Sequence, residues 1–391
     1  MPHPANEIGC FMTFPGRFAI ALLALSLAAP AAAQTVETEK TKIRVETVAT
    51  GLKHPWGLAF LPDGNFLVTE RPGFLRIVTP GGKVSNALYG VPEVDVRGQG
   101  GLLDVALDPD FEKNRLVYLS YAEKGEGNTN GTAVARGHLT QSLSPQLRNV
   151  EVIFRQQPKK DSHLHFGSRL VFDNDGHLFI ALGERSRVGM REEAQALNSH
   201  LGKVVRIMPD GSVPEDNPFV GADGALPEIW SYGHRNQQGA ALHPETGKLW
   251  TNEHGPRGGD EINIPEAGKN YGWPIVSYGR EYSGFAVGSG ESSAPGMEDP
   301  IHYWTPSIGV SGMTFYTGDA IPEWKGSLFV GGLARPGVYR LTLDGERVTG
   351  EERLLADMGS RIRDVRQGPD GAIYILTDEE DGKLLRIVKA E

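Results

Sequence analysis

The stretch from Thr251 to Trp273 carries the residue types of a metal site. It contains five glycines and two prolines, which preclude a regular helix. Its side chains with oxygen atoms suited to a hard cation are Glu253, Asp260, Glu261, Asn263 and Tyr271. Calcium accepts carboxylate and carbonyl oxygens alike, and the glycines allow the backbone to turn its carbonyls toward one point. The stretch therefore predicts a cation-binding loop, with a loop whose acids face water as the alternative.

Two histidines, His163 and His165, precede an expected strand. An imidazole titrates near neutral pH, so either side chain could take a proton from a substrate. A structural histidine held by hydrogen bonds is the alternative.

Arginines occur at two places where an anion could be held. Arg235 and Asn236 lie between two glycines, where the guanidinium could bind a carboxylate and the amide a carbonyl. Arg361 and Arg363 are two residues apart in an expected strand, so their side chains share one face. Such like charges repel unless an anion or water lies between them. A polar turn and a solvated strand edge are the respective alternatives.

The composition is that of a folded, acidic protein. The 391 residues are 23% charged and 39% hydrophobic, and the 50 glycines and 26 prolines indicate many turns. The formal net charge of −10, with no long run of lysine or arginine, disfavours a nucleic-acid partner.

The N-terminus has the pattern of a secretory signal. Arg17 precedes an apolar run from Phe18 to Ala29, and three alanines follow at its exit. The run is too short for a permanent membrane span. We expect residues 1–33 to be a signal peptide and residues 34–391 to be a single catalytic domain in the periplasm. The only cysteine, Cys10, lies in the expected signal, so the mature chain cannot use disulfides.

A turn pair followed by a β-rich run recurs along the chain. About six copies occur at spacings of roughly 45 to 80 residues, which suits propeller blades with loop insertions. Clear copies begin at Asp63, Asp175 and Asp370, and looser ones at Asn114, Thr246 and Lys325.

The predicted fold is all-β, a six-bladed β-propeller of four-stranded antiparallel blades. Residues Ile43–Val48 alternate like a strand and are a candidate to complete the last blade. A short helix is expected near Arg191–Leu201, and Gly279–Met297 has the composition of a long surface insertion. A multi-sheet sandwich is the alternative architecture.

Five segments, taken in order, resemble the soluble quinoprotein sugar dehydrogenases, in particular the bacterial aldose sugar dehydrogenases. The segments are Arg97–Asp104, His165–Leu170, Trp230–Asn236, Thr251–Pro274 and Arg361–Val365. The resemblance runs from about Leu52 to Val388, and the family has a six-bladed propeller. It implies pyrroloquinoline quinone (PQQ) and Ca²⁺ as cofactors.

The resemblance also implies which residues would hold PQQ, a planar tricarboxylate. Gln99 and Asn236 would hydrogen-bond it, and Arg235, Arg361 and Arg363 would offset its negative charge.

Two calcium positions are implied by the same match. The backbone carbonyls of Gly255 and Pro256 would hold the Ca²⁺ that touches PQQ and polarises it. Glu261 and Tyr271 match a second, structural Ca²⁺ site.

The match makes His165 the general base, which would take the proton of the anomeric hydroxyl while the hydride on that carbon passes to the quinone, giving a lactone. Arg235 would stabilise charge developing on the quinone oxygen. Glu184 stands where glucose dehydrogenase has an aspartate, and would orient His165. The lysine that often faces PQQ is replaced by Ala334, which leaves the neighbouring Arg335 as a candidate to reach the cofactor.

These features favour a PQQ- and calcium-dependent aldose dehydrogenase. Its substrates would be aldose sugars, and an external electron acceptor is required because the chain has neither a haem-attachment motif nor a dinucleotide fingerprint. A calcium-dependent sugar lactonase and a non-catalytic ligand-binding propeller are the alternatives. A neutral lactone has no need of three arginines, and a binding module has no need of His165. The sequence leaves monomer and homodimer open.

Overall fold

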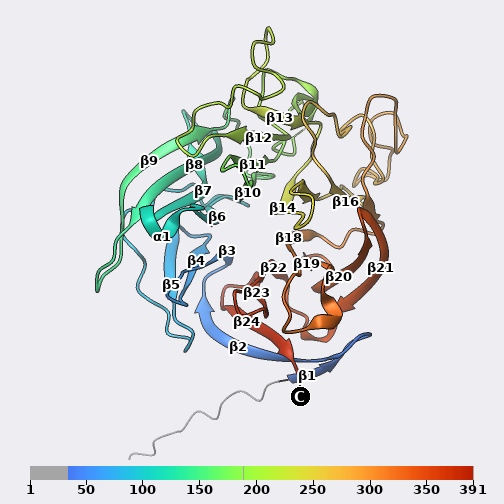
Figure 1. Ribbon diagram of the computed structural model, residues 1–391. Coiled ribbons are helices and arrows are strands. Elements are labelled where there is room, and N and C mark those ends of the chain that lie inside the picture. The colour runs from blue at the N-terminus through green and yellow to red at the C-terminus, as the bar shows by residue number, and fades with distance from the viewer. Residues whose placement is uncertain (1–33, 188, 391) are drawn as a thin grey trace, which may run out of the picture. The chain divides into compact units, whose positions relative to one another are not determined.

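Six antiparallel sheets follow one another around a central axis (Figure 1). The computed structural model describes residues 34–187 and 189–390, so the predicted signal peptide at 1–33 lies outside the described residues. The arrangement confirms the six-bladed β-propeller and rules out the sandwich.

Each blade is a meander whose first strand lies nearest the axis. The first three blades comprise β3 (Pro55–Phe60), β4 (Phe66–Glu70) and β5 (Phe74–Val78); β6 (Leu102–Leu107), β7 (Leu116–Lys124), β8 (Asn130–Leu139) and β9 (Leu147–Arg155); and β10 (Gly167–Phe172), β11 (Leu178–Leu182), β12 (Lys203–Ile207) and β13 (Ile229–Tyr232). The last three comprise β14 (Gln237–Leu242), β15 (Leu249–Glu253), β16 (Asp260–Asn263) and β17 (His302–Trp304); β18 (Val310–Phe315), β19 (Leu328–Gly332), β20 (Gly337–Asp344) and β21 (Arg347–Leu354); and β22 (Ile362–Gln367), β23 (Ile373–Thr377) and β24 (Gly382–Lys389), with β2 (Lys42–Leu52) and β1 (Gln34–Glu37).

The ring is closed by the N-terminal strand β2, which pairs with the C-terminal strand β24. Ile43 lies opposite Lys389 and Val45 opposite Ile387. The predicted role of Ile43–Val48 is therefore confirmed. Blade size departs from four at the two ends of the chain, because the first blade has three strands and β1 adds a fifth to the last.

Every repeated turn pair falls between the first and second strands of a blade. The second strands β4, β11, β19 and β23 are buried along their whole length, because neighbouring blades cover both faces. Six clusters of buried apolar side chains lie between adjacent blades and form the core. Packing of blade against blade thus holds the ring without disulfides.

Short helices cap a few connections. They are α1 (Phe111–Asn114) and the 3₁₀ turns η1 (Arg191–Gln195), η2 (Pro322–Trp324) and η3 (Ala356–Met358). The helix predicted over Arg191–Leu201 is shorter than expected. The Lys203 ammonium donates to the carbonyls of Glu193, Ala194 and Leu201, which a longer helix would have used itself.

The segment Gly279–Met297 contains no strand and joins β16 to β17 as a long connection, as predicted. No helix within residues 34–187 and 189–390 is long and apolar enough to cross a membrane.

Candidate functional site

A cavity of about 330 Å³ lies where the inner strands begin, at one end of the propeller axis. The first residues of inner strands and the residues that follow second strands line most of it. Inner strands contribute Trp56, Leu103, Gly167, Gln238 and Arg363, and the ends of second strands contribute Arg71, His254, Leu333 and Asp378. The blade repeat therefore brings residues from distant parts of the chain to one place.

Arg361 and Arg363 line the cavity together and share one carboxylate. Asp378 Oδ2 accepts a hydrogen bond from Arg361 Nη2 at 3.1 Å and from Arg363 Nη2 at 2.8 Å. Burial would raise the pKa of Asp378, but the two guanidinium groups outweigh it and hold the pKa well below its usual range. The anion that the sequence pattern required between these arginines is thus a residue of the chain itself.

The cavity retains an excess of positive charge. Arg71 lines it as well, so three guanidinium groups face a single carboxylate. The buried Nε of Arg363 has no hydrogen-bond partner among the described residues. Trp56 and Phe166 add flat apolar surface. This combination fits a planar ligand with several negative charges, which describes PQQ.

His165 and Glu184 form a buried pair beside this cavity. His165 Nδ1 and Glu184 Oε2 are 2.9 Å apart, and Glu184 follows the second strand of the third blade. Burial would raise the pKa of Glu184, but His165 and Arg235 lower it overall, so the carboxylate accepts from Nδ1–H. Nε2 then carries the free lone pair.

The pKa of His165 lies below its ordinary value. Burial is the main cause, and Glu184 opposes it without outweighing it. His165 also adopts φ of 49°, a left-handed conformation that is uncommon for non-glycine residues. The imidazole is therefore neutral near pH 7 and can accept a proton at Nε2.

Gln99 and Asn236 connect this pair to the cavity. Gln99 lines the cavity, and its Oε1 accepts from the His165 backbone N–H at 2.8 Å. Asn236 is buried, and its Oδ1 accepts from Gly167 N–H at 3.2 Å.

Arg235 lies on the same side, because Glu184 N–H donates to the Arg235 carbonyl at 2.9 Å. Its Nη1 donates to the His254 carbonyl at 2.9 Å, and its guanidinium lies 5.1 Å from the ring centroid of Trp273. The buried Nε has no hydrogen-bond partner among the described residues.

The predicted cation loop folds into a small hollow next to Arg235. Gly255, Glu261 and Tyr271 line it, together with Glu253. Burial raises the pKa of Glu261 well above its ordinary value, and Glu253 raises it further. Two buried carboxyl groups that repel one another form a site that a divalent cation would stabilise, so the residues fit calcium.

The loop's other predicted ligands take defined places. Asp260 Oδ1 accepts from the Gly255 N–H at 2.9 Å, which fixes the turn that carries the Gly255 and Pro256 carbonyls. The Tyr271 hydroxyl donates to the Ile264 carbonyl and accepts from Glu266 N–H, so it braces the loop from within.

Five candidates for proton transfer or PQQ binding are not among the residues that line the cavity: His165, Arg235 and Asn236, which contact lining residues, and Arg335 and His163. Arg335 is exposed and does not line it, although Leu333, two residues earlier, does. The side chain of His163 does not line it either, and its backbone carbonyl accepts from Gln99 N–H at 2.8 Å.

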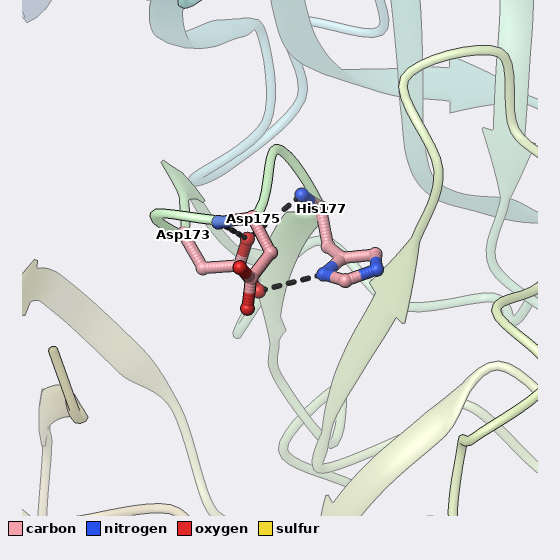
Figure 2. A group of neighbouring side chains, drawn as sticks. All are labelled: Asp173, Asp175 and His177. Atoms are coloured by element: carbon pink, nitrogen blue, oxygen red, sulfur yellow. Dashed lines mark hydrogen bonds and ion pairs between the residues drawn. The ribbon is translucent and has the colours of Figure 1, made fainter.

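Asp173, Asp175 and His177 cluster at the turn between β10 and β11 (Figure 2). Their hydrogen bonds are internal to that turn. Asp173 Oδ1 accepts from the backbone N–H of Asp175 at 3.0 Å and of His177 at 2.8 Å, and Oδ2 contacts the His177 ring. The cluster closes a hairpin turn at the opposite end of β10 from the cavity.

Sequence reasoning missed Arg71, His254 and Asp378 as cavity residues. A signal for them existed, since each directly follows the second strand of a repeat, and Glu184 comes two residues after such a strand. Aligning the six repeats at their turn pairs would have placed all four at one mouth of the ring.

Known proteins share both sequence and fold with this chain. The family model described as glucose/sorbosone dehydrogenase matches residues 52–386. An aldose sugar dehydrogenase of Escherichia coli, YliI, is 50% identical over 373 residues, covering 95% of this chain and 97% of the relative. A crystal structure of a glucose dehydrogenase is 54% identical with a TM-score of 0.86, covering 89% of this chain and 99% of that one.

A PQQ-bound aldose sugar dehydrogenase of Streptomyces coelicolor is 29% identical with a TM-score of 0.72, covering 92% of this chain and 99% of that one. These matches confirm the resemblance found in the sequence. The chain belongs to the glucose/sorbosone dehydrogenase family.

Proposed function

We propose that this protein is a PQQ- and calcium-dependent aldose sugar dehydrogenase of the periplasm. It would oxidise the anomeric carbon of aldoses to lactones and pass the electrons to an external acceptor. Residues 34–391 would act as one catalytic domain after removal of residues 1–33. The observation that carries the proposal is the arginine-rich cavity bordered by a neutral, carboxylate-oriented histidine.

Relatives support the cofactor and substrate class. The Streptomyces coelicolor structure contains PQQ, and the Escherichia coli relative is named an aldose sugar dehydrogenase. When bound, PQQ supplies the two-electron oxidant for the hydrogen on the anomeric carbon. Arg361, Arg363 and Gln99 would hold it from the cavity wall, and Asn236 and Arg235 would reach it from behind the lining residues Gly167 and His254, which they contact. Calcium would be held by the Gly255 and Pro256 carbonyls, and a second calcium by Glu261 and Tyr271.

The chain's own part in the chemistry is proton removal. Nε2 of His165 takes the proton of the anomeric hydroxyl, so that the carbon–oxygen double bond of the lactone can form as the hydrogen leaves the carbon. Glu184 keeps the ring in the required tautomer and stabilises the imidazolium that results. The positive charge of Arg235 would stabilise negative charge that develops on the quinone oxygen.

The test is reduction of a redox dye by glucose and other aldoses after PQQ and Ca²⁺ are added to the protein. We expect His165→Ala to lower turnover by about 10²- to 10⁴-fold while PQQ binding, followed by absorbance, stays nearly intact. His163→Ala is the matched control, because the His163 ring, unlike that of His165, pairs with no carboxylate among the described residues, and it should retain turnover.

Bound PQQ without dye reduction by any aldose would overturn the dehydrogenase proposal. Hydrolysis of sugar lactones by the same preparation would favour the lactonase instead. Loss of PQQ binding in His165→Ala would make His165 a structural residue.

A further inference from the structure

One layer of the propeller axis follows a simple rule. The third residue of every inner strand is either glycine or charged: Gly57, Asp104, Arg169, Gly239, Gly312 and Asp364. Three charged side chains therefore meet on the axis, and three glycines leave them room.

The glycines are required by close approach and not by their backbone angles, since none of the three has a positive φ. A Cβ added at Gly57 would lie 2.8 Å from Asp104 Oδ1, and one at Gly312 would lie 2.0 Å from Asp364 Oδ1. The layer therefore has no room for a side chain at Gly57 or Gly312.

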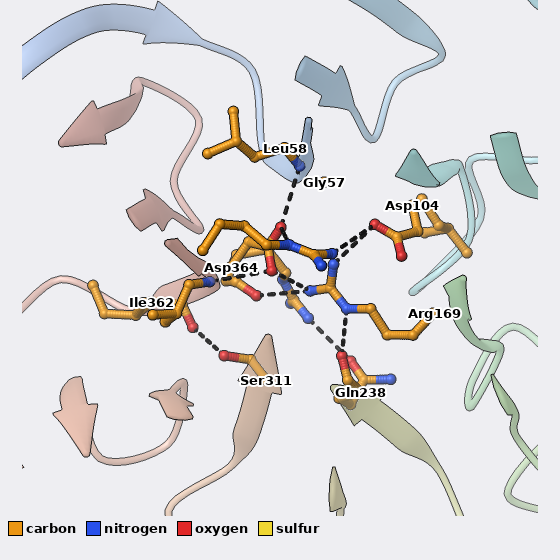
Figure 3. Close-up of polar contacts among 12 residues, drawn as sticks. Gly57, Leu58, Asp104, Arg169, Gln238, Ser311, Ile362 and Asp364 are labelled. Atoms are coloured by element: carbon orange, nitrogen blue, oxygen red, sulfur yellow. Dashed lines mark hydrogen bonds and ion pairs between the residues drawn. The ribbon is translucent and has the colours of Figure 1, made fainter. Parts of the chain in front are cut away.

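Arg169 occupies the centre of this layer, where its guanidinium reaches several blades at once (Figure 3). It lies between two buried carboxylates, with Nη1 3.0 Å from Asp104 Oδ1 and Nη2 3.1 Å from Asp364 Oδ1. Nε donates to the Gln238 carbonyl at 2.7 Å, and Nη2 donates to the Arg363 carbonyl at 3.2 Å. Its carbon Cζ lies 4.1 Å from the ring centroid of Trp56.

Three of these partners line the cofactor cavity: Trp56, Gln238 and Arg363. Gln238 and Arg363 are also joined above the layer, because Arg363 Nη1 donates to Gln238 Oε1 at 3.1 Å. The orientation of the arginine that faces the ligand therefore depends on backbone positions that Arg169 holds.

A second arginine in the cluster provides an internal comparison. Arg366 pairs with the same two acids, at 3.3 Å from Asp104 and 3.1 Å from Asp364. It lines a separate cavity of about 380 Å³, at the ends of the inner strands, and its hydrogen bonds and ion pairs with described residues involve no residue of the cofactor cavity. Two arginines and two aspartates cancel in charge, so the cluster adds no net charge to either cavity.

We propose that Arg169 is a positioning residue for the PQQ site, which sets the Trp56 ring and the Gln238–Arg363 pair of the cavity lining. The proposal rests on the proposed function. Its effect on the ligand is geometric, because the cluster is neutral, whereas Arg361 and Arg363 act through their charge. If the cluster only stabilised the fold, neither arginine would affect PQQ binding in the folded protein.

Arg169→Lys and Arg366→Lys separate these cases, since each keeps the charge and loses the planar fork. PQQ binding is measured by quenching of tryptophan fluorescence at several salt concentrations. We expect Arg169→Lys to raise the dissociation constant by about 10- to 100-fold with the salt dependence of the wild type, because no charge is lost. Arg366→Lys should stay within about threefold of the wild type.

A second measurement needs no cofactor. Trp56 is buried, so acrylamide should quench its fluorescence poorly in the wild type. In the protein without PQQ, the fluorescence of Trp56 alone is obtained by subtracting the signal of the same variant carrying Trp56→Phe. Arg169→Lys should expose Trp56, and Arg366→Lys should not. If the wild type binds no PQQ, the proposed function fails, and this measurement still decides the role of Arg169.

Equal effects of the two lysine variants, or no effect of Arg169→Lys on either measurement, would overturn the proposal. If Arg169→Lys does not fold, the charge-balanced pairs Arg169→Gln with Asp104→Asn and Arg366→Gln with Asp104→Asn replace the single variants, because they leave no unpaired buried charge. The pair that contains Arg169→Gln should weaken PQQ binding and expose Trp56 more than the pair that contains Arg366→Gln. Equal effects of the two pairs would count against the proposal.

Discussion

Replacing Glu184 by glutamine tests the proton-transfer site most directly. The carboxylate accepts from His165 Nδ1 at 2.9 Å, and it is the main group that raises the His165 pKa against the effect of burial. Glutamine keeps the shape of the side chain and removes the charge. Two effects follow, one on the rate and one on the pH profile.

The rate falls because the imidazolium formed during proton transfer loses its counter-charge. A hydrogen bond to a charged group contributes about 1.5–3 kcal/mol, and about 1.4 kcal/mol is a factor of ten in rate. We therefore expect kcat to fall about 10- to 150-fold. Without the carboxylate the charged form of His165 is less stable, so its pKa falls further.

The sign of the pH effect follows from the base being active when neutral. Activity of the wild type should be lost as the pH falls through the lowered pKa of His165. In Glu184→Gln the acidic limb of the kcat/KM profile should move to still lower pH while the plateau drops. NMR titration of His165 in the protein without PQQ gives the same shift independently of turnover.

Glu192→Gln is the matched control, because Glu192 is exposed and its removal changes the net charge by the same amount. Its acidic limb should coincide with that of the wild type. An acidic limb that stays in place in Glu184→Gln, or moves to higher pH, would refute the assignment of Glu184 and His165 as an acid–base pair.

Three further outcomes are expected. Arg361→Gln should weaken PQQ binding and reduce its dependence on salt, measured by fluorescence quenching; an unchanged salt dependence would mean that Arg361 does not act through its charge. Chelation of calcium should lower the melting temperature, because Glu253 and Glu261 then repel each other in the hollow that they line. Glu261→Gln should make this fall in melting temperature smaller. An equal fall in the wild type and in Glu261→Gln would argue against calcium at Glu261. Gly312→Ala should cost about 1–3 kcal/mol in urea unfolding through overpacking, whereas Gly350→Ala, whose new Cβ would meet nothing closer than 3.7 Å, should be nearly neutral; similar costs would refute the close-packed axial layer.

The propeller architecture could be predicted because each blade has the same short sequence pattern, a turn pair followed by a β-rich run. Each blade begins its second strand with a turn pair, and glycine and aspartate mark such turns by their own conformational preferences. The strand Ile43–Val48 was identified by its alternation, and its pairing with β24 follows from the need to close the ring.

The partners of the site residues could not be predicted in the same way. That Asp378 neutralises Arg361 and Arg363 depends on side-chain distances between positions 15 to 17 residues apart. The pairing of Glu184 with His165 was expected from the family resemblance alone, and the structure contains it. Repeat alignment fixes which strand ends converge, but not which of their side chains face one another. Arg335 illustrates the limit, because a neighbour of the lining residue Leu333 is directed away from the cavity.

The charged layer on the axis explains how the propeller tolerates irregular strands beside its cavity. All six inner strands shift register against their second strands within the first residues, at the end where the cavity lies. Such bulges change the direction in which side chains point, but they leave backbone N–H and C=O groups without hydrogen-bond partners in the sheet. Buried backbone groups need hydrogen-bond partners. The layer supplies several of them. Asp104 accepts from Leu170 N–H at 2.9 Å and Asp364 from Leu58 N–H at 3.2 Å, while Arg169 donates to two carbonyls. Ion pairs at this depth add little stability by themselves, so their role here is to replace interrupted sheet hydrogen bonds at the level where the ligand-binding side chains emerge.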